Sequence, residues 1–245
     1  MLFGHLPPLI PKSLWPPNLI LERGLNQMPS ALACLLVLLV CLVLHVSGDA
    51  PVAKFPLQLS GTITITAHLI DEDSTYPPRQ RSMRIYYDYT NKRARADIEA
   101  GYEAAKVYVR RYDEDNEYMV RLPPLDDCKR SYLGEVMPYP DIGDTKYFND
   151  EVINGVHCNH FIYEAFDTRV HMYLSSADGA PVKMIQEEIQ DQESVPLLTY
   201  EYSEVTLGPP DSAFFELPNG YTHEKCDRHV AGFPYLHVFH HFVKF

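Results

Sequence analysis

The stretch LQLSGTITITAHLID, from Leu57 to Asp71, alternates apolar with polar side chains and is rich in β-branched residues. The alternating positions are Ile63, Ile65 and Ala67 against Thr62, Thr64 and Thr66. Successive side chains of an extended strand point to opposite faces, so a period of two places the apolar set on one face. The stretch therefore predicts a β-strand with one buried face.

Runs of the same kind recur along the chain and are separated by turn residues. Residues 82–100 form two alternating runs around the TNK turn, in which we expect Asn91 to adopt a positive φ. Residues 104–122 form a second hairpin around the charged loop 113–117. Further turns are expected at Asn154-Gly155, Asp167-Thr168 and Ala177-Asp178-Gly179, before a last long strand at 196–207. This spacing predicts an antiparallel, all-β domain with little helix.

Two segments depart from the strand pattern. IGDTKYFND, residues 142–150, has a weak helical period. In GPPDSAFFELP, residues 208–218, the two prolines end the preceding strand and Asp211 can cap a short helical turn. The apolar side chains of Phe214 and Phe215 predict that this second segment packs on the sheet, where we expect it to close one open end.

The stretch from Met28 to Pro51 has the composition of a secretory signal peptide. Residues 31–44 are uncharged and apolar, which is too short for a membrane-spanning helix and suits the apolar core of a signal. We expect cleavage after Gly48; the alternative is an uncleaved anchor. The proline-rich residues 1–27 are expected to be an upstream extension that is either not translated or disordered.

Composition limits the function of the part that follows the signal. The whole chain has 21 basic and 33 acidic residues, of which residues 1–48 hold two basic and one acidic. The remaining 19 basic and 32 acidic residues give a net charge of −13. Such a chain repels nucleic acid, because phosphate binding depends on Lys and Arg.

The part of the chain that follows the signal holds three cysteines, Cys128, Cys158 and Cys226, and an oxidising compartment predicts one disulfide among them. Spacing does not choose among the three pairs; we favour Cys128–Cys158.

Three segments resemble a known domain family. They are YYDYTNKRARADI (86–98), FNDEVINGVHCNHF (148–161) and TYEYSEVTLGPPDSAFFELP (199–218), the last followed by Lys225-Cys226. Together they resemble the non-catalytic N-terminal domain of papain-type protease precursors, namely the insect haemocyte two-subunit cathepsins and the counting-factor-associated proteins. The first segment is also similar to a hairpin of ependymin-related proteins. The resemblance implies a LolA-like half-barrel: a curved antiparallel sheet around an apolar cavity, closed by short helical segments.

Aromatic residues at alternating strand positions are the candidate lining of such a cavity. They are Tyr86, Tyr108, Phe161, Tyr163, Tyr173, Tyr200 and Tyr202. A half-barrel must either fill its concave face with side chains or hold a ligand there, and the pattern leaves both open. The resemblance implies a lipid or another apolar molecule as the ligand.

No catalytic set is expected in this chain. The Cys-Gly-Ser-Cys-Trp segment of papain-type enzymes is missing, and in the sequence HCNH the side chains of His157 and Cys158 point to opposite faces of a strand. His237 and His241 in the tail are spaced for a shared metal ion, but no carboxylate follows Gly232, so no metal or other cofactor is predicted. The acidic loops lack the spacing of an EF-hand.

We therefore predict four parts: an extension at 1–27, a signal at 28–48, a LolA-like β domain at 49–226 and a His- and aromatic-rich tail at 227–245. The expected function is a secreted or endolysosomal binding module without enzymatic activity, without nucleic acid as a partner and without a membrane span after the signal. It would hold an apolar ligand or dock on a papain-like protease. The alternatives are the front part of a cysteine protease precursor and an ependymin-like, calcium-binding adhesion protein.

Overall fold

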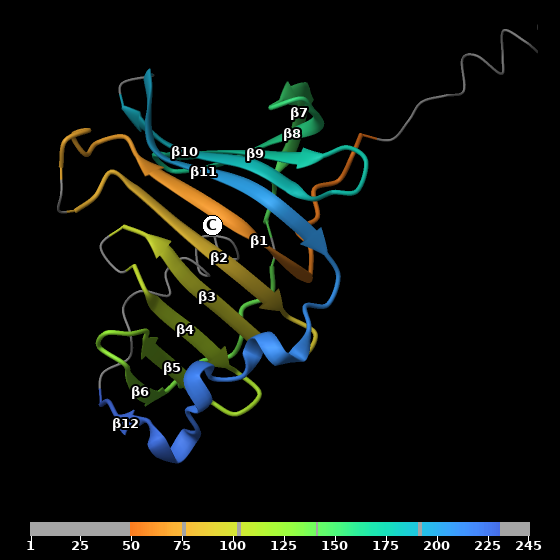
Figure 1. Ribbon diagram of the computed structural model, residues 1–245. Helices are drawn as coiled ribbons and strands as arrows, with labels where there is room; N and C mark the ends of the chain where they lie inside the picture. Colours follow the sequence, from red (N-terminus) through yellow and green to blue (C-terminus); the bar gives the residue numbers. More distant parts are fainter. Residues whose placement is uncertain (1–49, 75–76, 102–103, 141, 191–192, 231–245) are drawn as a thin grey trace, which may run out of the picture. The chain divides into compact units, whose positions relative to one another are not determined.

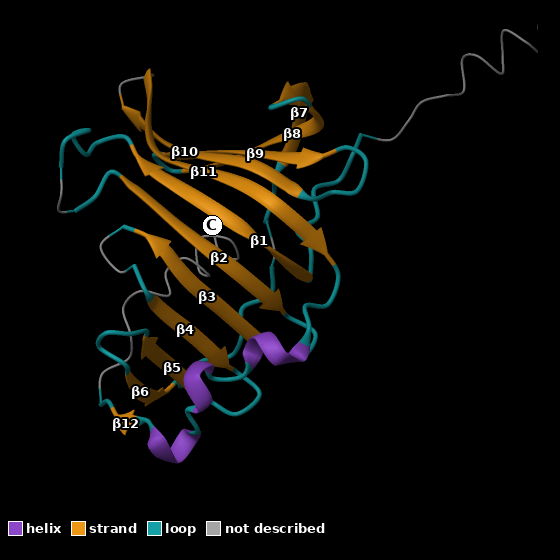
Figure 2. Cartoon of the chain, in the orientation of Figure 1, coloured by secondary structure: helices purple, strands orange, loops and turns teal. Residues whose placement is uncertain are grey.

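The computed structural model describes residues 50–74, 77–101, 104–140, 142–190 and 193–230. In this part of the chain one twelve-stranded sheet accounts for every strand, and the only helices are three 3-10 turns (Figures 1 and 2). The sheet is curved and does not close on itself, as Figure 1 shows for the unit that follows Asp49. The predicted fold class, an all-β half-barrel built on one antiparallel sheet, is confirmed.

The strand order is β12-β6-β5-β4-β3-β2-β1-β11-β10-β9-β8-β7. The strands are β1 (Gln58–Ala67), β2 (Gln80–Asp88), β3 (Arg93–Ala100), β4 (Lys106–Arg111), β5 (Asn116–Arg121), β6 (Asp127–Tyr132), β7 (Lys146–Ile153), β8 (Val156–Ala165), β9 (Thr168–Ser175), β10 (Pro181–Gln190), β11 (Glu193–Leu207) and β12 (Asp227–Arg228). Two meanders, β1 to β6 and β7 to β11, join where β11 pairs with β1. All pairs are antiparallel except β12 with β6.

Strand β1 has the predicted alternation and lies at the centre of the sheet. Leu59, Ile63 and Ile65 are 0 to 2% exposed, whereas the threonines between them are only half-buried. The two neighbours of β1 pair along almost its whole length. Gly61 lies where β11 approaches closely, since a Cβ there would lie 3.2 Å from the Ser203 carbonyl oxygen. We call the face that carries Leu59, Ile63 and Ile65 the inner face and the opposite one the outer face.

The inner face holds the main hydrophobic core. Paired residues of an antiparallel sheet share a face, so the core extends from Met119 on β5 through β1 to Phe161 on β8. It is covered by chain without regular structure. The connection 133–145 runs from β6, which lies next to the terminal strand β12, to β7 at the opposite end of the sheet. It contributes Met137 and Ile142 to the core, and the segment before β1 contributes Phe55.

A second apolar cluster lies on the outer face of β4 to β6. It consists of Val107, Val109, Tyr118, Val120, Cys128 and Cys226. The covering segment contains the turns η1 (Ser212–Phe215), η2 (Pro218–Gly220) and η3 (His223–Lys225). Asp211 caps η1 as predicted, because its Oδ1 accepts from the Ala213 amide at 2.9 Å. The segment lies against the outer face, from Tyr86 on β2 to β6, and not at an open end of the sheet as predicted.

Two local predictions are wrong. The left-handed residue of the β2–β3 turn is Lys92, with φ 57°, and not Asn91. Asn91 instead donates its amide and its side-chain Nδ2 to the Asp88 carboxylate, which stabilises the turn from inside. The weak helical period at 142–150 is also misleading, because residues from Lys146 onward form strand β7.

The favoured disulfide is wrong as well. Cys128 bonds to Cys226, with a Cα–Cα distance of 4.6 Å, and Cys158 is a buried free thiol. Cys158 lies on β8, close to the opposite end of the strand order from β6, so a bond to Cys128 would require two Cα atoms to come within about 7 Å across most of the sheet. The true partner arrives through η3, which packs beside β6.

Candidate functional site

The structure places five of the seven predicted cavity aromatics on the inner face. Within or against the core cluster lie Tyr108, Phe161, Tyr163, Tyr200 and Tyr202. They come from β4, β8 and β11, strands of both meanders. These side chains therefore share one apolar surface.

Tyr86 and Tyr173 lie on the outer face. The Tyr86 ring stacks on Phe214 of η1 with 4.2 Å between centroids, and the Tyr173 ring stacks on His160 at 4.3 Å. Each lies within a run of four consecutive buried side chains, 85–88 and 172–175. Because both faces are buried at these points, the alternation that assigns a face is hidden in the sequence.

The inner face is a filled core in which tyrosine hydroxyls are kept from water. Burial raises the pKa of Tyr200 to about 12 and raises that of Tyr87 further above its ordinary value. Both phenols therefore stay protonated and can donate hydrogen bonds. Tyr87 donates to the Pro138 carbonyl of the covering connection at 3.3 Å.

A pocket of about 280 Å³ opens at the border of this cover. Its lining comes from the segment before β1 and from the connection: Ala53, Lys54, Phe55, Leu57, Tyr139, Pro140 and Ile142. Phe55 and Ile142 belong to the core, whereas Leu57 is 41% and Tyr139 57% exposed. The pocket thus leads from a partly exposed apolar rim to the core under the connection.

A polar cluster ties the connection to the inner face. The Arg110 guanidinium on β4 donates to Glu135 of the connection at 2.6 Å and to the Tyr112 hydroxyl at 3.0 Å, and it lies 3.4 Å from Glu117 on β5. Arg110 and Glu117 are 6% and 2% exposed. The connection is therefore held by the Arg110–Glu135 ion pair, in which the Glu135 side chain is 38% exposed, and by its apolar side chains. The sequence did not predict this cluster.

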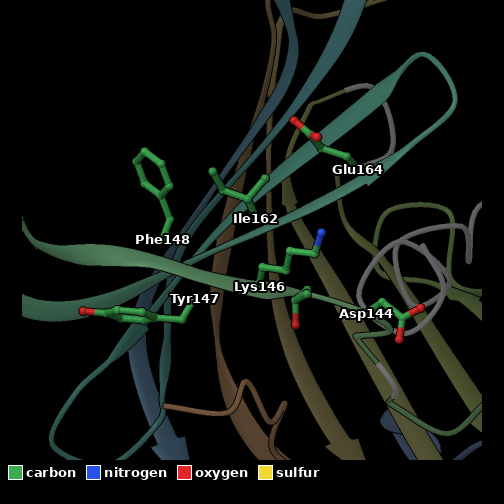
Figure 3. Close-up of a pocket in the computed structure, with 7 residues that line it drawn as sticks. Asp144, Lys146, Tyr147, Phe148, Ile162 and Glu164 are labelled. Atoms are coloured by element: carbon green, nitrogen blue, oxygen red, sulfur yellow. The ribbon is translucent and has the colours of Figure 1, made fainter. Parts of the chain in front are cut away.

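A larger pocket of about 890 Å³ lies at the outermost strand β7. Asp144, Thr145, Lys146, Tyr147, Phe148, Ile162 and Glu164 line it. Figure 3 shows Phe148, Ile162 and Glu164 on one side of the β7–β8 ribbon, with the Lys146 side chain between Ile162 and Asp144. The pocket combines exposed charges with apolar side chains and is wider than the first. No sequence pattern indicated it.

The thiol of Cys158 has no activating neighbour. Burial raises its pKa, and its Sγ donates to the Val156 carbonyl at 3.4 Å. A nucleophilic cysteine needs the opposite, a lowered pKa next to a cation or a helix N-terminus. Cys158 therefore acts as a small core side chain.

Several carboxylates of the acidic loops form ion pairs with arginines. Glu72 pairs with Arg79, and Arg111 pairs with Asp113 and Glu114. Within the described ranges no group of three or more His, Cys, Asp or Glu side chains is arranged to hold a metal ion. The tail histidines 237 and 241 lie outside the described residues, as does the predicted signal at 28–48.

Over the same described residues, no helix has the length and apolar character needed to cross a bilayer. No protein-family model matches the chain, and no curated protein has a matching sequence.

Some solved structures resemble this chain at low sequence identity. An uncharacterised conserved protein from Thermus thermophilus aligns at 10% identity over 71% of this chain and 92% of its own, with a TM-score of 0.48. MucB in complex with MucA aligns at 10% identity over 72% and 57%, with a TM-score of 0.37. A LolA superfamily protein from Nitrosomonas europaea aligns at 12% identity over 67% and 92%, with a TM-score of 0.32. Since these TM-scores lie below 0.5, they assign neither family nor function.

Proposed function

We propose that this chain is a non-catalytic binding module that holds an apolar ligand, such as a lipid chain, between the inner face of its sheet and the connection 133–145. The observation that carries the proposal is the kind of cover on the inner face. A continuous apolar surface is closed by a segment without regular structure, and an apolar-lined pocket opens at its border. Ligand sites are typically concave, mostly apolar and marked by a few polar groups.

The pocket is small, so part of the connection must move to make room for a ligand. A volume of about 280 Å³ lies just below the range of about 300–1,000 Å³ that is usual for ligand sites. Displacing Met137 and Ile142 from the core would enlarge it along the inner face. The connection can shift more readily than a strand, because it lacks a hydrogen-bonded ladder of its own.

We further propose an oxidising compartment, secreted or endolysosomal, as the place of action. The disulfide between Cys128 and Cys226 supports this, since such bonds persist outside the reducing cytosol. Docking on a papain-like protease remains a prediction from the resemblance, to be tested by co-purification with such an enzyme.

The binding proposal is tested with a fluorescent fatty-acid probe and two pairs of substitutions. Leu57→Asp and Tyr139→Asp place charges on the rim of the pocket, at positions exposed enough to keep the fold. We expect each to weaken probe binding at least tenfold. The matched controls Leu69→Asp and Leu125→Asp change side chains that are 70% and 64% exposed and lie outside the pocket.

The controls should leave probe affinity within twofold of the parent protein. Absence of saturable binding in the parent protein, or equal losses in rim and control variants, would refute the proposal. Native mass spectrometry of the protein from its own source adds a readout without a probe, because a retained ligand appears as added mass.

A further inference from the structure

A chain of four side chains crosses the outer face at the β7 end of the sheet, one from each of four adjacent strands. Glu151 on β7 contacts His160 on β8, His160 contacts His171 on β9, and His171 contacts Glu187 on β10. The nitrogen–oxygen and nitrogen–nitrogen distances are 3.1, 2.9 and 3.2 Å in that order. Each imidazole nitrogen thus faces a hydrogen-bonding partner.

The partners fix where the hydrogens lie. Nδ1 of His160 faces the Glu151 carboxylate and the Asn149 side-chain oxygen, so it carries a hydrogen. Nε2 of His160 is then free to accept from Nδ1 of His171. Nε2 of His171 faces the Glu187 carboxylate and also carries a hydrogen when the pair holds one positive charge. In this singly charged state the four ring nitrogens hold three hydrogens.

A fourth hydrogen does not fit this arrangement. It would sit on Nε2 of His160 and point at the Nδ1–H of His171 across 2.9 Å. Two imidazolium rings would then repel each other with their centroids 5.1 Å apart. His160 is 3% exposed, so water cannot screen the second charge well. The second protonation must break the contact between the rings.

We propose that the chain Glu151–His160–His171–Glu187 is an acid-sensitive latch that holds the edge strand β7 on the sheet and releases it when both imidazoles are protonated.

The position of His160 explains why β7 would respond. The His160 ring stacks on Tyr173 of β9 and meets the Phe148 ring of β7 edge-on, with 5.2 Å between centroids. Strand β7 has a single strand partner among the described residues, β8, and their register shifts between Tyr147 and Asn149. Strand β7 thus has one backbone ladder instead of two, and its side-chain contacts add to that ladder. A His160 ring that turns away from His171 disturbs these contacts.

Titratable groups from four strands surround the two imidazoles. Those facing the pair from the packed strands are Lys146 and Glu151 of β7, Cys158 and Glu164 of β8, Arg169 and Tyr173 of β9, and Glu187 and Lys183 of β10. Burial, followed by the charge of His171, lowers the pKa of His160, while Glu151 opposes this shift. Histidine ordinarily titrates near pH 6.5, so the second proton binds below that pH.

Hydrogen exchange of the protein tests the latch without any ligand. Between pH 7.5 and 5.0, after correction for intrinsic exchange rates, we expect protection of the β7 amides 146–153 to fall at least tenfold. In His171→Gln the glutamine can still donate to His160 but cannot be protonated. The protection of the β7 amides in this variant should therefore change less than twofold between pH 7.5 and 5.0. The control His157→Gln alters an exposed histidine on the same strand as His160 and should behave as the parent protein.

Equal protection of β7 at both pH values in the parent protein would overturn the proposal, and so would the same tenfold fall in His171→Gln. Imidazole nitrogen NMR of the unmodified protein gives a second test that requires no variant to fold. The His160 nitrogens should respond to pH in more than one step, because this ring contacts a second imidazole. A response of His160 in one single step would contradict the latch. Because no ligand is present, failure here leaves the apolar-ligand proposal unaffected, and the reverse also holds.

Discussion

Asp88 shows how one residue can organise a turn from a buried position. Its carboxylate is fully buried and accepts from Gln58 Nε2 at 2.7 Å, from the amide and Nδ2 of Asn91, and from Arg93 at 3.1 Å. Burial by itself would raise the pKa of Asp88, but the hydrogen bonds from Asn91, Gln58 and Arg93 outweigh burial and lower it. The ionised form is therefore the one that stabilises the fold.

Replacing this carboxylate tests its contribution. Asp88→Asn places an amide NH₂ against the donors, and we expect a loss of about 2 kcal/mol in the free energy of unfolding at pH 7. Because the pKa of Asp88 is lower in the folded state, the carboxyl group of the unfolded chain is protonated at a higher pH than that of the folded chain. The stabilisation is thus complete above about pH 4 and disappears as the pH falls further. Urea unfolding at pH 7 and pH 3 measures both effects.

The matched control is Asp71→Asn, an exposed carboxylate in the turn after β1. It should change the unfolding free energy by less than about 0.5 kcal/mol. A loss for Asp88→Asn that is the same at pH 7 and pH 3 would show that the charge does not matter.

Which face a residue occupies could be predicted only where alternation is clean. Ile63 and Ile65 alternate with threonines, so their burial followed from the sequence. Tyr86 and Tyr173 sit among consecutive apolar residues, because η1 covers one of them and a histidine stacks on the other. The cover of the outer face comes from a segment remote in sequence, and local patterns do not contain that information.

At the scale of elements, strands and hairpins were predictable because their signals are local. The turn at Asn154-Gly155 has the positive φ values of 50° and 81° that its residues favour. The pairing of β1 with β11 and the path of the connection 133–145 depend on contacts between distant residues. The disulfide belongs to this second group, since Cys226 reaches β6 only after η1 to η3 have crossed the sheet.

The disulfide closes a loop with a sequence separation of 98 residues and fastens the outer cover. Cys128→Ser with Cys226→Ser should therefore lower the free energy of unfolding by about 3 to 4 kcal/mol, mainly by freeing the unfolded chain. Denaturant unfolding measures the loss. Peptide mapping under non-reducing conditions should recover the peptide of Cys128 bonded to that of Cys226.

Cys158→Ala is the control for this experiment. It removes a buried thiol but no bond, so we expect a loss of about 1 kcal/mol. Recovery of a peptide that links Cys128 to Cys158 would contradict the structure, as would an unchanged stability in the double serine variant.

At the scale of the whole molecule, the inner core links the two meanders. It contains Met119 from β5 and Met172 from β9, which lie in different meanders, and it also contains Met137 from the connection that runs between them. The open sheet has no barrel closure to unite its ends. A shared core and the β1–β11 ladder must do so instead, and both predict that the described unit unfolds as one.

Reciprocal core substitutions test this cooperativity. Met172→Ala and Met119→Ala each create a cavity on the inner face, and we expect each to lower the free energy of unfolding by about 2 to 3 kcal/mol. If the unit is cooperative, Met172→Ala lowers the protection of the slowest-exchanging amides in β4 and β5 as much as in β8 and β9, and Met119→Ala does the same in reverse. Native-state hydrogen exchange resolves the two regions. Val136→Ala, at a side chain that is 88% exposed, should leave both unchanged. Protection lost only in the meander that carries the substitution would mean that the connection covers two separate folding units and does not join them.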